Sequence, residues 1–131
     1  MLRFTSLHSA LLVVLLFQEA PPALAAEVET VQLRVTNAGN QTIEDLTVMF
    51  PLNKIYFGDV PAGATTEYLD VSGGVYRYAA YSFSVDGELQ SRPVTDFFGE
   101  MPVEGTRFTY VLRFEDGFRT SLLLEEVIRD R

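Results

Sequence analysis

Short runs of alternating apolar and polar residues recur along the chain, and glycine, proline, asparagine and aspartate bound them. A period of two is typical of a strand with one buried face, because successive side chains point to opposite sides. Val31, Leu33 and Val35 alternate with polar residues in this way, and the turn sequence NAGN at residues 37–40 ends the run. No helical spacing persists. The pattern therefore predicts an all-β fold.

Later runs predict further short strands with turn residues between them. They are Leu46 to Phe50, which ends at Pro51; a short strand at Ile55 and Phe57; and Thr65 to Val71, after a turn at residues 61–63. Two hairpins follow. Seven or eight short strands at this spacing predict an antiparallel, immunoglobulin-like β-sandwich, with a small closed β-barrel as the alternative.

The two hairpins each carry a glycine directly after an aspartate, at Asp86-Gly87 and Asp116-Gly117. Loop length decides which residues face each other across a hairpin. A three-residue loop with the glycine in a left-handed bulge places nearly every apolar residue on one face, whereas a two-residue loop does not. The expected pairs are Phe83 with Leu89, Tyr81 with Ser91, Phe114 with Phe118, Leu112 with Thr120, Tyr110 with Leu122, and Phe108 with Leu124.

The first 25 residues have the features of a secretory signal. Arg3 supplies a positive start, residues 10–17 are apolar, and Ala23-Leu24-Ala25 offers a small-x-small cleavage site. The apolar run is shorter than the roughly 20 residues that cross a bilayer. We expect residues 1–25 to be removed, and residues 26–131 to form one secreted or periplasmic domain without membrane insertion.

Composition narrows the chemistry of this domain. The net charge is −8, and it stays −8 after loss of the signal, which contains one arginine and one glutamate. Such a charge argues against nucleic-acid partners. The chain has no cysteine, and its one histidine, His8, lies in the signal. Nucleophile pairs with histidine and nearly all zinc or copper sites are thus excluded, and we expect no enzymatic activity, no cofactor and no metal.

Three other uses of the side chains stay open as alternatives. A small hydrolase would use a carboxylate pair, for which Asp96 and Glu100 are the candidates. Calcium would need the oxygens of Glu44, Asp45 and Asp59, or of Asp96, Glu100 and Glu104, although no dense Asp-x-Asp loop is present. A carrier would enclose an apolar ligand in a barrel cavity lined by Phe83, Tyr110 and Leu112.

The stretch YRYAAYSFSVDG at residues 76–87 places three of the six tyrosines close to Arg77. If Tyr81 and Phe83 face inward, simple alternation buries Arg77 and exposes Tyr76 and Tyr78, and an unpaired buried charge is costly. A β-bulge at residues 79–80 would bury both tyrosines and expose the arginine. The alternative is an edge segment at residues 75–78 with exposed tyrosines. We favour the bulge because it buries more apolar area.

Aromatic residues also occur together in the long connection from Pro93 to Thr106. Adjacent Phe97 and Phe98 cannot both face one side of a strand, and exposed aromatic groups favour binding to a partner or a sugar. The candidate binding surface is Tyr76, Arg77, Tyr78, Phe97 and Phe98.

Two groups of motifs resemble known bacterial proteins. VTNAGNQTIEDLTVMFP followed by FGDVPAGATTEYLDV resembles the first half of many bacterial extracytoplasmic immunoglobulin-like domains. YRYAAYSFSVDG, DFFGEMP and GTRFTYVLRF resemble a family of small secreted bacterial β-sandwich proteins with no known activity. Many of that family have a lipobox cysteine, which this chain lacks. The resemblance implies a secreted or periplasmic, non-catalytic module that binds a protein or glycan of the cell envelope or serves as a structural accessory there.

Overall fold

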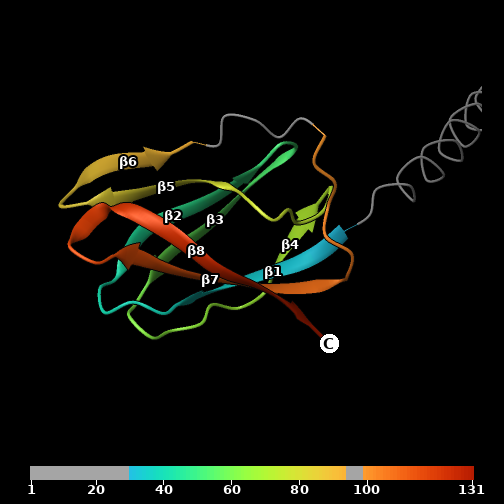
Figure 1. The fold of residues 1–131 in the computed structure, drawn as a ribbon, viewed down its shortest axis with the longest axis horizontal. Helices are drawn as coiled ribbons and strands as arrows, with labels where there is room; N and C mark the ends of the chain where they lie inside the picture. Colours follow the sequence, from blue (N-terminus) through green and yellow to red (C-terminus); the bar gives the residue numbers. More distant parts are fainter. Residues whose placement is uncertain (1–29, 94–98) are drawn as a thin grey trace, which may run out of the picture.

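The computed structural model describes residues 30–93 and 99–131 (Figure 1), and this part of the chain contains eight β-strands and no α-helix. The strands are β1 (Thr30–Asn37), β2 (Ile43–Phe50), β3 (Asn53–Val60), β4 (Leu69–Ser72), β5 (Ala80–Val85), β6 (Glu88–Arg92), β7 (Arg107–Glu115) and β8 (Phe118–Asp130). The predicted all-β fold is confirmed. The expected signal, residues 1–25, lies outside the described residues. No helix long and apolar enough to span a membrane occurs within the described ranges.

The strands form two four-stranded sheets, ordered β4-β1-β7-β8 and β3-β2-β5-β6 (Figure 1). The sheets pack on each other, with β8 against β5 and β6, and β3 against β1 and β4. Each sheet keeps two free edges, so the fold is a β-sandwich and not one closed sheet. One pair departs from the antiparallel expectation, because β1 and β7 run parallel. Parallel neighbours need a long connection, and the chain supplies it by building the whole second sheet between them.

The core lies between the two sheets and follows the alternation in the sequence. Along β1, every second residue from Val31 is buried, and the residues between them are partly exposed. The largest fully buried side chains come from both sheets, among them Tyr110, Phe83 and Phe108. Because the three residues expected to line a carrier cavity, Phe83, Tyr110 and Leu112, all belong to this packed cluster, their side chains serve the core.

Asn37 closes the connection between β1 and β2 and is fully buried. Its side-chain nitrogen donates to the carbonyl oxygens of Gln41 at 2.7 Å and Val60 at 2.9 Å, and its side-chain oxygen accepts from the backbone N–H of Gly39 at 3.0 Å. All polar atoms of this amide are thus used. The turn predicted at residues 37–40 is confirmed, and the side chain also fastens it to the end of β3.

The strand predicted from Thr65 to Val71 is shorter in the structure, where β4 begins only at Leu69. Thr65 forms an isolated bridge with Thr36, and the backbone N–H of Thr66 donates to the carbonyl of Val35 at 2.8 Å. Between these contacts and β4, the Tyr68 ring lies against the guanidinium groups of Arg34 and Arg107.

The first hairpin has a two-residue loop, so the predicted three-residue loop at Asp86-Gly87 is wrong. Phe83 pairs with Gln90, and not with Leu89, while Tyr81 pairs with Arg92, and not with Ser91. Both loop residues have positive φ, 52° for Asp86 and 80° for Gly87, which is the geometry of a type I′ turn. Burial of Leu89 favoured the longer loop, but β6 is an edge strand, and Leu89 is exposed.

The second hairpin also differs from the predicted register. Gly117 has the expected left-handed conformation, with φ at 80°, but Glu115 pairs with Phe118 across a two-residue loop. Two irregularities in β8 then shift the pairing. The observed partners are Phe114 with Leu122, Leu112 with Leu124, Tyr110 with Val127 and Phe108 with Arg129, in place of Phe118, Thr120, Leu122 and Leu124. The shifts set leucine opposite Leu112, where the predicted register set a threonine, and leave Phe118 exposed.

Residues 73–79 cross from β4 in one sheet to β5 in the other and belong to no strand. Neither the bulge at residues 79–80 nor the edge segment at residues 75–78 is therefore correct. Tyr76 is buried against Phe50, with 5.8 Å between ring centroids, and its carbonyl accepts a hydrogen bond from the Tyr110 hydroxyl. Arg77 and Tyr78 are exposed. The crossover thus buries the first tyrosine and releases the arginine to solvent.

We expect the two buried tyrosine hydroxyls to affect stability in opposite directions. Tyr110→Phe removes the hydrogen bond to the Tyr76 carbonyl and should lower the free energy of unfolding by about 1–3 kcal/mol. The Tyr81 hydroxyl is buried without a hydrogen-bond partner in the described chain, so Tyr81→Phe should raise that free energy by about 1 kcal/mol. Urea unfolding of both variants measures the difference; an equal loss in both would contradict the assigned roles.

Candidate functional site

The structure does not assemble the predicted aromatic surface as one patch. Tyr76 is in the core, while Arg77 and Tyr78 are exposed, Tyr78 with 48% of its surface accessible. Phe97 and Phe98 lie outside the described residues. Of the predicted site residues, Arg77 is the one that lines a hollow of the described surface.

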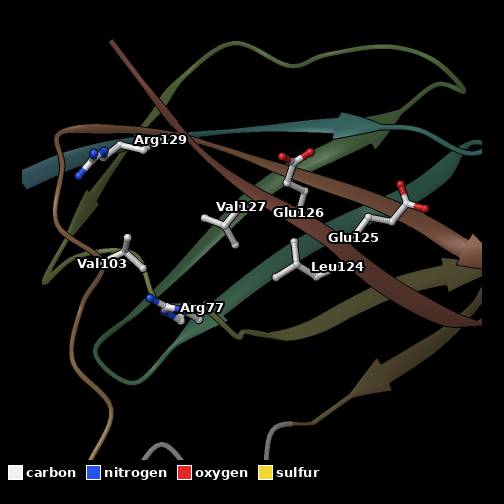
Figure 2. A pocket seen from close by; sticks show the side chains of 7 residues that line it. All are labelled: Arg77, Val103, Leu124, Glu125, Glu126, Val127 and Arg129. Atoms are coloured by element: carbon white, nitrogen blue, oxygen red, sulfur yellow. The ribbon is translucent and has the colours of Figure 1, made fainter.

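A groove of about 390 Å³ lies between Arg77 and the second half of β8 (Figure 2). Its lining consists of Arg77, Val103, Leu124, Glu125, Glu126, Val127 and Arg129. An adjoining hollow of about 550 Å³ shares Arg77, Val103 and Arg129 and continues over residues 99–102 and Glu104. Leu124, Val127 and Val103 are partly buried and pack against the core, so they give the groove an apolar floor.

A close contact between two backbone segments positions Arg77. The crossover runs beside residues 99–106, where the backbone N–H of Val103 donates to the carbonyl of Val75 at 2.8 Å. Gly74 has φ at 93°, and a Cβ atom on it would lie 2.7 Å from the Cβ of Pro102. Only glycine fits this approach without displacement. The segment that carries Arg77 is therefore held against one wall of the groove.

A second glycine holds the stem of Arg129. A Cβ atom on Gly105 would lie 2.8 Å from the Cδ and 2.9 Å from the Cγ of Arg129, so the aliphatic part of the arginine passes directly over the glycine backbone. Gly105 has φ at 140°. The arginine stem is thereby covered, while the guanidinium group lies in the groove wall (Figure 2).

The residue after Arg129 is anchored on the outer face of the sheet. The Asp130 carboxylate accepts hydrogen bonds from the hydroxyls of Thr109 at 2.6 Å and Tyr68 at 2.8 Å, and it forms an ion pair of 3.9 Å with Arg34. The Tyr68 ring lies beneath the guanidinium groups of Arg34 and Arg107, 4.7 and 4.1 Å from its centroid. These contacts fix the end of β8 and hence the backbone of Arg129.

This network also determines the charge of Asp130. Burial alone would raise the pKa of its carboxyl, but the hydrogen bonds from Thr109 and Tyr68, with the charges of Arg34 and Arg107, outweigh burial and lower the pKa below its usual value. Asp130 thus stays ionised and continues to hold the strand end at neutral pH.

The charges around the groove are unevenly matched. Glu125 is paired with Arg113 on the adjacent strand, and Figure 2 shows the side chains of Glu125 and Glu126 pointing away from Arg77. Arg77 and Arg129 form no ion pair with any residue in the described ranges. Two guanidinium groups without an ion-pair partner among the described residues thus border a groove with an apolar floor, although the chain as a whole carries −8.

The carboxylates considered for calcium or hydrolysis do not form a centre in the described part of the chain. Asp45 accepts hydrogen bonds from the hydroxyls of Tyr56 at 3.2 Å and Ser84 at 2.9 Å, and Asp59 accepts one from the backbone N–H of Asp45. Glu100 and Glu104 line the hollow beside the groove. No cluster of three or more metal-ligating side chains occurs among the described residues, and Asp96 lies outside them.

Comparisons with family models, with curated proteins and with solved structures gave no match to this chain. The fold and the groove therefore carry the functional argument.

Sequence reasoning identified Arg77 and missed the opposite wall. The predicted register placed Leu124 opposite Phe108, whereas the structure places Arg129 there. The predicted pairs therefore ended at Leu124 and assigned no partner on the neighbouring strand to Val127 or Arg129. The apolar run at residues 122–124, which exceeds what one alternating face can bury, is the signal that β8 is irregular.

We expect Gly74→Ala to disturb this architecture more than a glycine substitution in open space. Gly63 has a similar φ of 77° with no atom within 4 Å of a Cβ position, so Gly63→Ala is the matched control. Both variants meet the left-handed backbone penalty of about 1–2 kcal/mol, and Gly74→Ala should lose about 1–3 kcal/mol more because it overlaps Pro102. Urea unfolding provides the comparison; equal losses would contradict the close contact.

We expect the ionised Asp130 carboxylate to stabilise the folded domain at neutral pH and to lose this effect in acid. Its folded-state pKa is below its unfolded value of about 3.9, so the stabilisation is complete above about pH 4 and is lost as the pH falls through the folded pKa. Asp130→Asn should lower the free energy of unfolding at pH 7 by about 1–2 kcal/mol and flatten its decline below about pH 4. Tyr68→Phe removes one of the hydrogen bonds to Asp130, so its free energy of unfolding at pH 7 should lie between those of the wild type and Asp130→Asn. Denaturant unfolding across this pH range checks both; an unchanged acid slope in Asp130→Asn would contradict the assignment.

Proposed function

We propose that this protein is an exported, non-catalytic module with an immunoglobulin-like sandwich, and that it binds a protein or glycan of the cell envelope through the groove between Arg77 and Arg129. The observation that carries the proposal is a pair of guanidinium groups, without ion-pair partners in the described ranges, beside an apolar floor. Arginine with neighbouring apolar surface is typical of binding hot spots, because it combines charged hydrogen bonds with a stem that packs.

The distribution of the other arginines supports this reading. Arg34 and Arg113 are held in ion pairs within the first sheet, and Arg119, near the start of β8, is paired with Asp86 in the loop between β5 and β6. Arg107 is stacked on Tyr68. These residues have evident roles within the fold, and Arg77 and Arg129 lack comparable internal partners in the described ranges.

The sequence supports export and the absence of catalysis. Residues 1–25 have the pattern of a secretory signal, and residues 26–131 contain no histidine and no cysteine. Without these residues, the usual nucleophile pairs and thiolate sites are not available. A packed sandwich that presents a groove lined by two arginines fits a binding role in the envelope.

The proposal is tested by capture from native envelope fractions with residues 26–131 as the immobilised bait. The wild-type domain should retain a specific protein or glycan, and Arg77→Gln/Arg129→Gln should retain about tenfold less or none, because both charged contacts are lost.

The matched control is Arg92→Gln/Arg119→Gln, which removes the same charge from two exposed arginines outside the groove. It should retain the partner like the wild type. Equal retention by the groove variant, or no specific partner at all, would refute binding at this site. Fractionation of the producing cells gives a separate check, and recovery of the chain in the cytoplasm alone would refute export.

A further inference from the structure

The groove runs along the free edge of a strand. Glu126 and Val127 are consecutive in the regular part of β8, and both line the groove. Successive side chains of a regular strand point to opposite faces, so a hollow that touches both residues lies along the strand edge and not over one face. The ordering of the sheet agrees, because among the described strands β8 is the outermost of its sheet and pairs with β7 alone.

The end of this edge is regular. Between Glu126 and Asp130, the pairing of β8 with β7 follows one register without interruption, and the irregularity lies before it, between Leu124 and Glu126. In such a strand, alternate backbone N–H and C=O groups point away from the paired neighbour. Residues 126–130 therefore present a short row of hydrogen-bonding groups to the groove.

The groove has a second wall opposite β8. This wall is formed by Arg77 and Val103, and the backbone N–H of Val103 is already bonded to Val75. Leu124 and Val127 reach into the groove from β8, as Figure 2 shows, and provide apolar contacts for alternate side chains of a ligand. A backbone edge for main-chain bonds with apolar contacts beside it is the arrangement used for strand addition.

The charges select the ligand. Arg77 and Arg129 form no ion pair with a described residue, Glu125 and Glu126 line the same groove but point away from Arg77 (Figure 2), and Glu100 and Glu104 line the adjoining hollow. A carboxylate of the ligand is therefore stabilised between the two arginines and repelled further along. A second copy of this chain, at net charge −8, would meet repulsion over the rest of its surface. A glycan would leave the backbone edge unused.

We propose that the groove binds an extended acidic peptide segment of a partner protein, which adds as a strand to residues 126–130 of β8 and places a carboxylate between Arg77 and Arg129. This inference rests on the proposed binding function and names the class of partner. Main-chain hydrogen bonds to β8 supply affinity, and the arginine pair supplies selection for the acidic residue.

The test is a selection of random linear peptides from a display library on the immobilised residues 26–131. We expect enriched peptides with an aspartate or glutamate at a fixed position between apolar or β-branched residues. Replacing that acid with its amide should weaken binding about tenfold or more, and added salt should weaken binding of the parent peptide. No enrichment, or a consensus without an acidic residue, would overturn the proposal.

The variants and a spectroscopic readout locate the peptide. Arg77→Gln/Arg129→Gln should bind the selected peptides about tenfold more weakly or not at all, whereas Arg92→Gln/Arg119→Gln should match the wild type. NMR with the selected peptide should show new protection from hydrogen exchange in alternate amides of residues 126–130. Binding that is insensitive to the groove arginines, or protection confined to another edge, would overturn the proposal.

Failure of this inference can be separated from failure of the proposed function. Envelope capture of an arginine-dependent glycan without any selected peptide would leave the binding module in place and exclude the peptide. Selected peptides without any envelope partner would leave strand addition in place and exclude the envelope role.

Discussion

The hydrogen bond between the Tyr110 hydroxyl and the Tyr76 carbonyl fixes how the chain passes from one sheet to the other. Tyr76 lies on the crossover, and Tyr110 lies on β7 in the middle of the first sheet. A buried carbonyl outside a strand needs a donor, and the core supplies one. Because Tyr76 is turned inward here, the next residue, Arg77, is directed to the surface beside β8.

An acidic chain gains a local positive site when several of its other arginines are already held in ion pairs or stacked. Ion pairs and stacking hold Arg34, Arg107 and Arg113 on the first sheet, and the charges of Arg34 and Arg107 also act on Asp130, which anchors the end of β8. The order at the strand end is therefore coupled to the place of Arg129. The positive charge of Arg129 is thus held in place by contacts outside the groove. Such preorganisation lowers the cost of binding a ligand.

The sequence predicted the all-β sandwich because alternation and turn residues are local signals, as Val31 and the NAGN turn show. The crossover and the register of the last hairpin were not predictable in the same way. The exposed Phe118 and the buried Leu122 differ in burial because the pairing of β8 with β7 is irregular between them, which strict alternation does not predict. The β8 wall of the groove was not predicted for this reason. The close approach of Gly105 to Arg129 also joins residues from separate segments, which a local pattern does not reveal.

The open edge of β8 is the structural claim on which the binding role depends, and amide hydrogen exchange of the free domain measures it most directly. Along residues 126–130, amides bonded to β7 should exchange slowly, while the alternate amides, which face the groove, should exchange quickly. Slow exchange of every amide in this stretch would show that the edge is already covered and would contradict the claim.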